Sequence, residues 1–184
     1  MDLDVNANGD ELVGGIPFSL DDEPTKDIQL VSIDVISAFD KDQPKILFPL
    51  SFIKHIKLFW VSIQGELDTE NLDEPLVVDI PYKCLLLVHR YLDLCINQYK
   101  SQPITIPHPL RCDDLKYLTN EHEAAFIIDL WQTLPHSDFF ALIQTCNFID
   151  CPSLFYLALS QFVITIKNTP ETQLENILYD DRKK

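Results

Sequence analysis

Two histidines and one cysteine have the spacing closest to a set of metal ligands. His108 and Cys112 lie four positions apart, and His122 follows ten positions after Cys112. Structural zinc sites use four ligands that usually come in closely spaced pairs, whereas this set offers one cysteine among scattered histidines. The pattern therefore disfavours a metal site, and we expect the protein to use no cofactor.

A thiol nucleophile with a histidine base is the second chemistry that the residue types allow, through Cys84 or Cys95 with His89. Both cysteines lie in a mostly apolar stretch with helical periodicity, where a buried thiol is the commoner finding. The paired carboxylates Asp113–Asp114 and Asp180–Asp181 lie in polar segments, where solvated charge is the default interpretation. The chain also lacks nucleotide-binding, zinc-protease and nucleophile-elbow motifs. We therefore expect a protein that is not an enzyme.

The elements around these residues predict an α+β fold. Three short, β-branched stretches come first and a series of helical patterns follows, which is not the alternation of a doubly wound sheet. The predicted strands span 28–34, 45–50 and 76–80, the first two forming a hairpin about a turn at 40–44. The predicted helices span 51–60, 81–99, 121–134, 138–147, 153–167 and 169–178, and the prolines between 100 and 120 predict a variable loop.

Polar residues and prolines mark where four of these helices should begin. Ser51, Ser137 and Thr169 are the predicted N-caps, because a hydroxyl group there can accept a hydrogen bond from a free N–H group of the first turn. Pro81 and Pro170 suit the first helical position, where a missing N–H costs nothing. Thr169 and Pro170 are therefore the predicted N-cap and first residue of the same helix.

Charge distinguishes the N-terminal segment from the rest of the chain. The net charge is −15, and residues 1–27 carry acidic side chains with almost no counter-charge. We expect a disordered acidic tail there, because such a segment cannot bury enough apolar area to offset its ordering entropy. The alternative is a short docking peptide around residues 13–20. The charge also disfavours nucleic-acid and membrane partners, and no apolar run reaches the roughly 18 residues that a membrane span needs.

The five cysteines predict free thiols in a reducing compartment. Their number is odd and no Cys-x-x-Cys pair occurs, so the sequence offers neither a disulfide framework nor a redox motif. Four of the five lie in apolar or helical contexts. We expect these to be buried, as free cysteines commonly are.

The last third of the chain carries more apolar surface than one core should need. Residues 139–178 predict three short amphipathic helices, separated at 150–152 and 168–170. Apolar side chains wrap most of the stretch 153–167, and such a helix usually needs a further layer to cover it. We therefore expect residues 151–180 to form a helix pair for partner binding beside a core of residues 28–150. This favours a binding module.

Several short motifs resemble the BTB/POZ fold and, more narrowly, the S-phase kinase-associated protein 1 family of cullin adaptors. Residues 75–81, Pro-Leu-Val-Val-Asp-Ile-Pro, are similar to that family's strand before its long helix. Residues 142–150, Leu-Ile-Gln-Thr-Cys-Asn-Phe-Ile-Asp, are similar to a family helix that ends Ala-Ala-Asn-Tyr-Leu-Asp. Residues 166–171, Ile-Lys-Asn-Thr-Pro-Glu, resemble its Ile-Lys-Gly-Lys-Thr-Pro-Glu.

The resemblance implies a non-enzymatic adaptor that bridges a cullin scaffold and an F-box-type receptor in a ubiquitin ligase, located in cytoplasm and nucleus. Asn147 and Phe148 match positions that face the cullin. The helices after residue 153 match the start of the receptor-binding surface. The residues expected to bind the receptor are Leu154, Leu157, Phe162, Ile166, Leu174, Ile177 and Leu178.

Departures from the family pattern support a second interpretation. Thr145 and Cys146 replace two alanines, Phe148 replaces a tyrosine, and Asn168 stands where the family has a glycine turn. The family normally continues past the position of Leu178 with further helices. The alternative is a structural or regulatory BTB module that has lost cullin binding and forms a homodimer or holds one dedicated partner.

Overall fold

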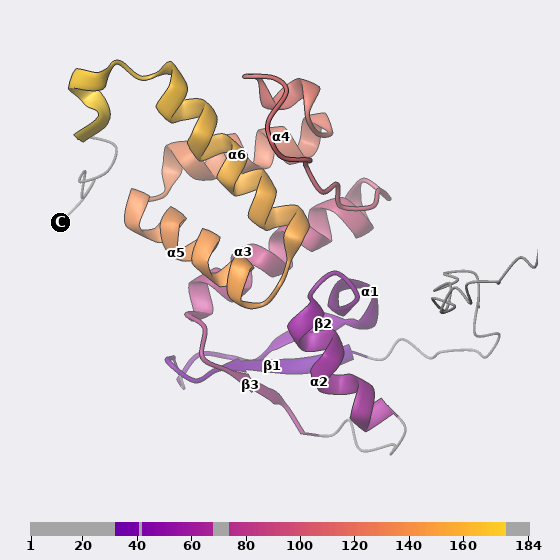
Figure 1. Ribbon diagram of the computed structural model, residues 1–184. Helices are drawn as coiled ribbons and strands as arrows, with labels where there is room; N and C mark the ends of the chain where they lie inside the picture. Colours follow the sequence, from indigo (N-terminus) through magenta and orange to yellow (C-terminus); the bar gives the residue numbers. More distant parts are fainter. Residues whose placement is uncertain (1–31, 41, 68–73, 176–184) are drawn as a thin grey trace, which may run out of the picture.

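The protein is an α+β protein, as the sequence predicts. The computed structural model describes residues 32–40, 42–67 and 74–175. A three-stranded sheet with two short helices forms one end of this part, and helices α4, α5 and α6 form the other, with α3 between them (Figure 1). The acidic tail expected over 1–27 lies outside the described residues.

The sheet is built from β1 (Ser32–Ser37), β2 (Ile46–Pro49) and β3 (Leu76–Val78). Strand β1 lies in the middle, antiparallel to β2 and parallel to β3, so the predicted hairpin is confirmed. Ile33 pairs with Phe48, and both side chains are buried. Alternate residues of β1 face the helices, because successive side chains of a strand point to opposite faces.

The single helix predicted over 51–60 is two helices, α1 (Leu50–Ile53) and α2 (Lys57–Leu67), and that prediction is wrong. The first two N–H groups of α2 donate to the carbonyl oxygens of Asp150 and Ile149, each at 3.1 Å. These groups have no partner within their own helix. A tertiary contact to the turn after α5 therefore allows the chain to start a new helix, which local periodicity does not reveal.

Helices α3 (Tyr82–Asp93) and α4 (Glu121–Thr133) confirm two of the predicted helices. The π-helical turn η1 (Leu94–Gln98) extends α3 to nearly the predicted end. Pro81 is the N-cap of α3 and not its first residue. The proline-rich segment between α3 and α4 is a loop as expected, apart from the 3-10 helix η2 (Leu115–Tyr117).

Helices α5 (His136–Phe148) and α6 (Pro152–Asn168) confirm the next two, although α5 begins earlier than predicted. Ser137 is not the N-cap. Pro135 holds that position with an extended backbone, and its carbonyl oxygen accepts hydrogen bonds from the N–H groups three and four residues later, at 3.0 and 3.1 Å.

The other two predicted caps are also wrong. Ser51 lies inside α1, whose N-cap is Pro49, and Thr169 is the C-cap of α6. Pro170 is the N-cap of the 3-10 helix η3 (Glu171–Gln173), and the helix predicted over 169–178 is described only as far as residue 175. Prolines with extended backbone thus replace hydroxyl caps, because their restricted φ already directs the chain into the helix.

One hydrophobic cluster joins the sheet and helices α1 to α6. Helix α6 contributes Leu154, Leu157 and Ala158 to this cluster, each at most 1% exposed. The division predicted at residue 150 therefore does not separate a core from an added helix pair. Leu154 and Leu157 are core residues, which corrects their prediction as surface residues for a receptor.

A buried carboxyl group, that of Glu123 in α4, fixes the loop between α3 and α4. Its Oε1 accepts hydrogen bonds from the Tyr91 hydroxyl at 2.8 Å and the Ile104 N–H at 3.1 Å, and it lies 3.6 Å from the Cys95 thiol. The Thr119 hydroxyl donates to its other oxygen. Glu123 is 0% exposed, so a side chain that is normally solvated has its acceptors satisfied by the protein.

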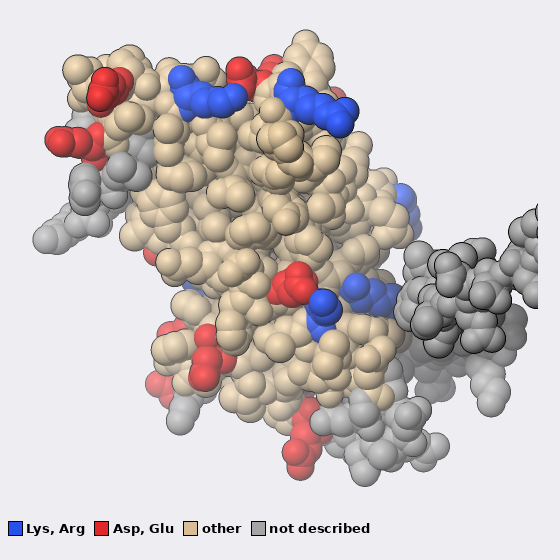
Figure 2. Space-filling model, in the orientation of Figure 1, with Lys and Arg blue, Asp and Glu red and all other residues tan. Residues whose placement is uncertain are grey.

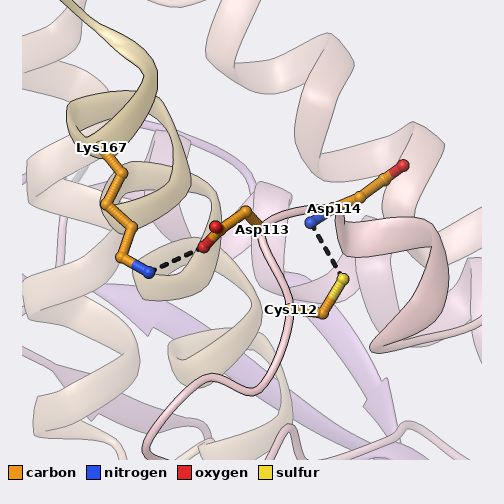
Figure 3. A network of polar contacts seen from close by, with 4 residues as sticks. All are labelled: Cys112, Asp113, Asp114 and Lys167. Carbon is orange, nitrogen blue, oxygen red and sulfur yellow. Dashed lines mark hydrogen bonds and ion pairs between the residues drawn. The ribbon is translucent and has the colours of Figure 1, made fainter.

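The same loop is tied to the end of α6 by a surface network (Figure 3). Lys167 Nζ lies 2.7 Å from Asp113 Oδ1, and the Asp114 N–H donates to Cys112 Sγ at 3.4 Å. Both side chains of the ion pair are more than half exposed, so we expect it to contribute at most about 1 kcal/mol.

Candidate interaction surfaces

The residues with metal-ligand spacing lie in different surroundings. The His108 ring packs on Tyr156 with centroids 4.7 Å apart, whereas His122 stacks on Tyr99 at 4.1 Å. Cys112 accepts a backbone hydrogen bond in its own loop. Within the described ranges, no group of three or more His, Cys, Asp and Glu side chains is placed to hold a metal ion.

The thiols near His89 are not arranged as nucleophiles. The Nε2 atom of His89 lies 3.1 Å from the carbonyl oxygen of Leu47, and its ring packs edge-on against Phe48. Burial raises the pKa of Cys84, and burial together with the charge of Glu123 raises the pKa of Cys95 to about 12. A catalytic cysteine needs a lowered pKa, because the thiolate is the nucleophile. These two thiols therefore behave as core groups.

Alkylation with iodoacetamide at pH 8 should separate Cys112 from the other four cysteines. Cys112 is half-buried, whereas the others are buried and have raised thiol pKa values. We expect the four to react at least about 100-fold more slowly, because they become accessible only through rare opening of the fold. Peptide mass spectrometry after timed labelling measures this, with urea-unfolded protein as the control. Equal rates for all five in the native protein would contradict the packing.

An apolar hollow lies between the end of β1 and the last turns of α5. It has a volume of about 230 Å³, and its lining includes Phe39, Ile80, Gln144 and Phe148. Phe39 and Phe148 are 68% and 58% exposed, so two large aromatic side chains on one depression remain in contact with solvent. We call this site the Phe39–Phe148 hollow. Exposed aromatic groups beside a depression are typical of protein-binding surfaces.

Long-range hydrogen bonds hold the Phe39 side of the hollow in place. The buried Ser37 hydroxyl donates to the carbonyl oxygen of Ile80 at 2.6 Å. Asp40 Oδ2 accepts a hydrogen bond from the first N–H group of α3, that of Tyr82, at 2.9 Å. Ser37 and Asp40 are therefore anchored to residues 80–82, at and just before the start of α3, while Phe39 between them is mostly exposed.

The sequence identified only part of this hollow. Phe148 was predicted and lines it, whereas the predicted Asn147 is exposed beside Phe148 but is not among the lining residues. Phe39 and Gln144 were missed. A phenylalanine directly before the acidic turn at 40–44 is a signal for an exposed aromatic group, but its neighbours come from a distant part of the chain.

A second apolar surface follows one face of α6. Leu159, Val163 and Ile166 are half-buried, and none of them is among the side chains that pack on the core cluster of the described residues. Their spacing of four and three positions places them on one side of a helix. We call them the α6 stripe. The sequence prediction included Ile166 and omitted the other two, because burial, which separates this face from the core face, depends on the packing partners.

The remaining residues predicted for receptor binding differ in their surroundings. Phe162 is half-buried and packs on Phe140, with ring centroids 5.1 Å apart, and on Trp131 at 6.2 Å. Leu174, just after η3, is half-buried and adds apolar surface beyond the end of α6. The other two predicted residues, Ile177 and Leu178, lie outside the part of the chain that the structure describes.

The described residues thus form an α+β fold that carries the Phe39–Phe148 hollow and the α6 stripe on different elements. Neither a protein-family model nor a curated protein matches the chain. Among the helices of the described residues, none has both the length and the hydropathy needed to cross a bilayer.

Proposed function

We propose that the protein is a non-enzymatic adaptor with a BTB/POZ fold that joins a cullin scaffold to an F-box-type receptor in a ubiquitin ligase of the cytoplasm and nucleus. The observation that carries this proposal is the presence of two apolar surfaces on different elements, the Phe39–Phe148 hollow and the α6 stripe. An adaptor needs two such surfaces, because it must hold two partners at once.

The scaffold partner is assigned to the Phe39–Phe148 hollow. The resemblance of residues 142–150 to the family's cullin-facing helix supports this assignment, since Phe148 lies in that stretch and is exposed. Asp79 lies in the same lining, so a helix with an apolar side chain next to a lysine or arginine would complement the hollow.

The receptor is assigned to the α6 stripe, Leu159, Val163 and Ile166, together with Phe162 and Leu174. An amphipathic helix of a receptor can pack its apolar side chains against such a stripe, as helices do in hydrophobic grooves. By resemblance, the receptor-binding residues continue after η3 with Leu174, Ile177 and Leu178.

Replacing both Phe39 and Phe148 by alanine should weaken cullin binding at least about 30-fold, because truncation of one central aromatic group typically costs 2 kcal/mol or more. The fold should be unchanged, since both side chains are mostly exposed. Asn147→Ala should have a smaller effect. Calorimetry with a purified cullin N-terminal region measures the affinities. Tyr117→Ala is the matched control, because Tyr117 is 81% exposed and lies in η2, away from the residues that line the hollow.

Affinity purification of the tagged full chain tests the proposal as a whole. We expect the wild-type chain to recover a cullin together with F-box proteins. The Phe39→Ala/Phe148→Ala variant should recover the F-box proteins without the cullin. Recovery of neither class, in a preparation that is folded by circular dichroism, would contradict the adaptor assignment.

A second candidate function is a BTB module that has lost cullin binding and self-associates. The outer face of the sheet favours it, because Leu47 on β2 and Val77 on β3 are 53% and 61% exposed. Their pairing partners on β1, Asp34 and Ile36, place the two side chains on the same face of the sheet. The mass in solution by light scattering separates a monomeric adaptor from a dimer, and Val77→Asp should restore the monomer.

A further inference from the structure

A second depression lies where α1 and α2 meet the turn between α5 and α6. It has a volume of about 450 Å³, and we call it the Lys54–Lys57 cleft after two of its lining residues. Trp60, Pro103 and Pro152 add apolar surface to its wall. The cleft shares no lining residue with the Phe39–Phe148 hollow and none with the α6 stripe, so neither proposed surface uses it.

The cleft is a site of positive charge on an acidic protein. Lys54 forms no ion pair with a described residue, and Lys57 lies 3.5 Å from Asp150, with both side chains more than half exposed. Figure 2 shows blue atoms beside red ones near the centre of this face, within a mostly uncharged surface. Such an exposed pair is weak, so an anionic ligand can compete for Lys57 while Lys54 is free.

His55 contributes a neutral polar group to the cleft. Burial, and then the charge of Lys54, lower the pKa of His55, so its ring is mostly uncharged at pH 7. The positive charge therefore comes from the lysines. The half-buried ring of Trp60 and the proline rings can contact an apolar side chain next to the anionic groups. The cleft thus fits a peptide in which apolar residues precede acidic ones.

We propose that the cleft binds residues 16–23 of the same chain, Ile-Pro-Phe-Ser-Leu-Asp-Asp-Glu. The apolar half of this segment matches Trp60 and the prolines, and its three consecutive acidic residues match the two lysines. The inference is independent of the adaptor assignment, because it uses other residues.

The chain connection brings this segment close to the cleft. Ser32, the first residue of β1, pairs with Pro49, which directly precedes α1 and therefore lies about one and a half helical turns from Lys54. Residues 24–31 connect the segment to Ser32 and can span roughly 30 Å when extended. A tether of this length gives an effective concentration in the millimolar range, so even a weak contact is populated.

A spin label in the full-length chain tests this contact. The label is attached to Gly15→Cys, next to the proposed segment in the sequence, in a Cys112→Ser background whose four remaining native thiols are buried. We expect the backbone amide signals of residues 54–60 to lose most of their intensity in the NMR spectrum. The variant Lys54→Glu/Lys57→Glu should restore them without changing the fold, because both lysines are exposed. Lys100→Glu/Lys116→Glu is the control and should leave the loss of intensity unchanged.

Three outcomes would overturn the proposal. Residues 54–60 retain their intensity, or the loss of intensity survives Lys54→Glu/Lys57→Glu. In the third, an equal loss appears when a spin-labelled copy of natural isotope abundance is mixed with a nitrogen-15 copy that carries no spin label, which would show contact between molecules. A charge exchange gives a further test. Adding Asp21→Lys/Asp22→Lys to the Lys54→Glu/Lys57→Glu variant should bring the loss of intensity back, because the two sets of opposite charges have then changed places.

Discussion

Replacing Glu123 by alanine is expected to lower the free energy of unfolding by about 3–5 kcal/mol. The change leaves the buried Tyr91 hydroxyl and the part-buried Ile104 N–H and Thr119 hydroxyl without their acceptor. A buried unsatisfied group costs roughly 1–3 kcal/mol, and the two part-buried donors should cost less because water can reach them. It also removes side-chain volume from a site that is 0% exposed. A typical domain has only about 5–15 kcal/mol of stability, so this variant should be near its unfolding limit.

The isosteric variant Glu123→Gln should lose less, about 1–2 kcal/mol. Its amide oxygen can keep the hydrogen bonds from Tyr91 and Ile104, while the hydroxyl of Thr119 can turn to accept from the amide nitrogen. Urea unfolding followed by circular dichroism measures both variants. Asp129→Ala is the matched control, because Asp129 is an exposed acid on the same helix and should change stability by less than about 0.5 kcal/mol. Equal midpoints for Glu123→Ala and Asp129→Ala would show that the carboxyl group does not hold the loop.

Leu157→Asp is expected to unfold the protein, whereas Ile166→Asp should leave it folded and unable to bind a receptor. Leu157 is 1% exposed in the core cluster, and an unpaired carboxylate there costs several kcal/mol beyond the lost apolar contacts. Ile166 lies on the same helix but is half-buried and not packed on that cluster. The same chemical change on two faces of α6 should thus have different effects.

Both the stability and the receptor binding of the two variants must be measured. Thermal unfolding gives the stability, and pull-down with an F-box protein gives the binding of each variant that remains folded. Asn168→Asp is the control, because it adds the same charge at an exposed position at the end of α6. Retention of receptor binding by a folded Ile166→Asp variant would remove the α6 stripe from the proposed interface. A folded Leu157→Asp variant would contradict the packing of α6 against the core.

The Lys54–Lys57 cleft and the Phe39–Phe148 hollow both have lining residues near the end of α5. Asp150 lines the first and Phe148 lines the second, with one residue between them. Asp150 has a φ of 52°, a left-handed conformation that reverses the chain between α5 and α6. A short turn therefore separates a surface proposed for a partner from a surface proposed for the chain's own N-terminal segment.

The class of the fold and most of its elements could be predicted from the sequence. Strands β2 and β3 and helices α3 to α6 follow from patterns within one segment, period two for strands and about 3.6 for helices. The first strand was predicted over 28–34; β1 spans Ser32–Ser37, and residues 28–31 lie outside the described part of the chain. The burial of four cysteines followed from their apolar neighbours in the sequence. Phe148 was also accessible to sequence reasoning, because its motif is contiguous.

Which apolar residues face outward depends on the tertiary packing. Periodicity shows that α6 has several apolar faces, but Leu157 is buried and Ile166 only half-buried in the structure, where α4 and α5 pack against α6. The break between α1 and α2 depends on carbonyl groups near residue 150, and the hollow joins Phe39 to Phe148 from distant parts of the chain. These features arise from contacts between segments, and the sequence of one segment does not contain its packing partners.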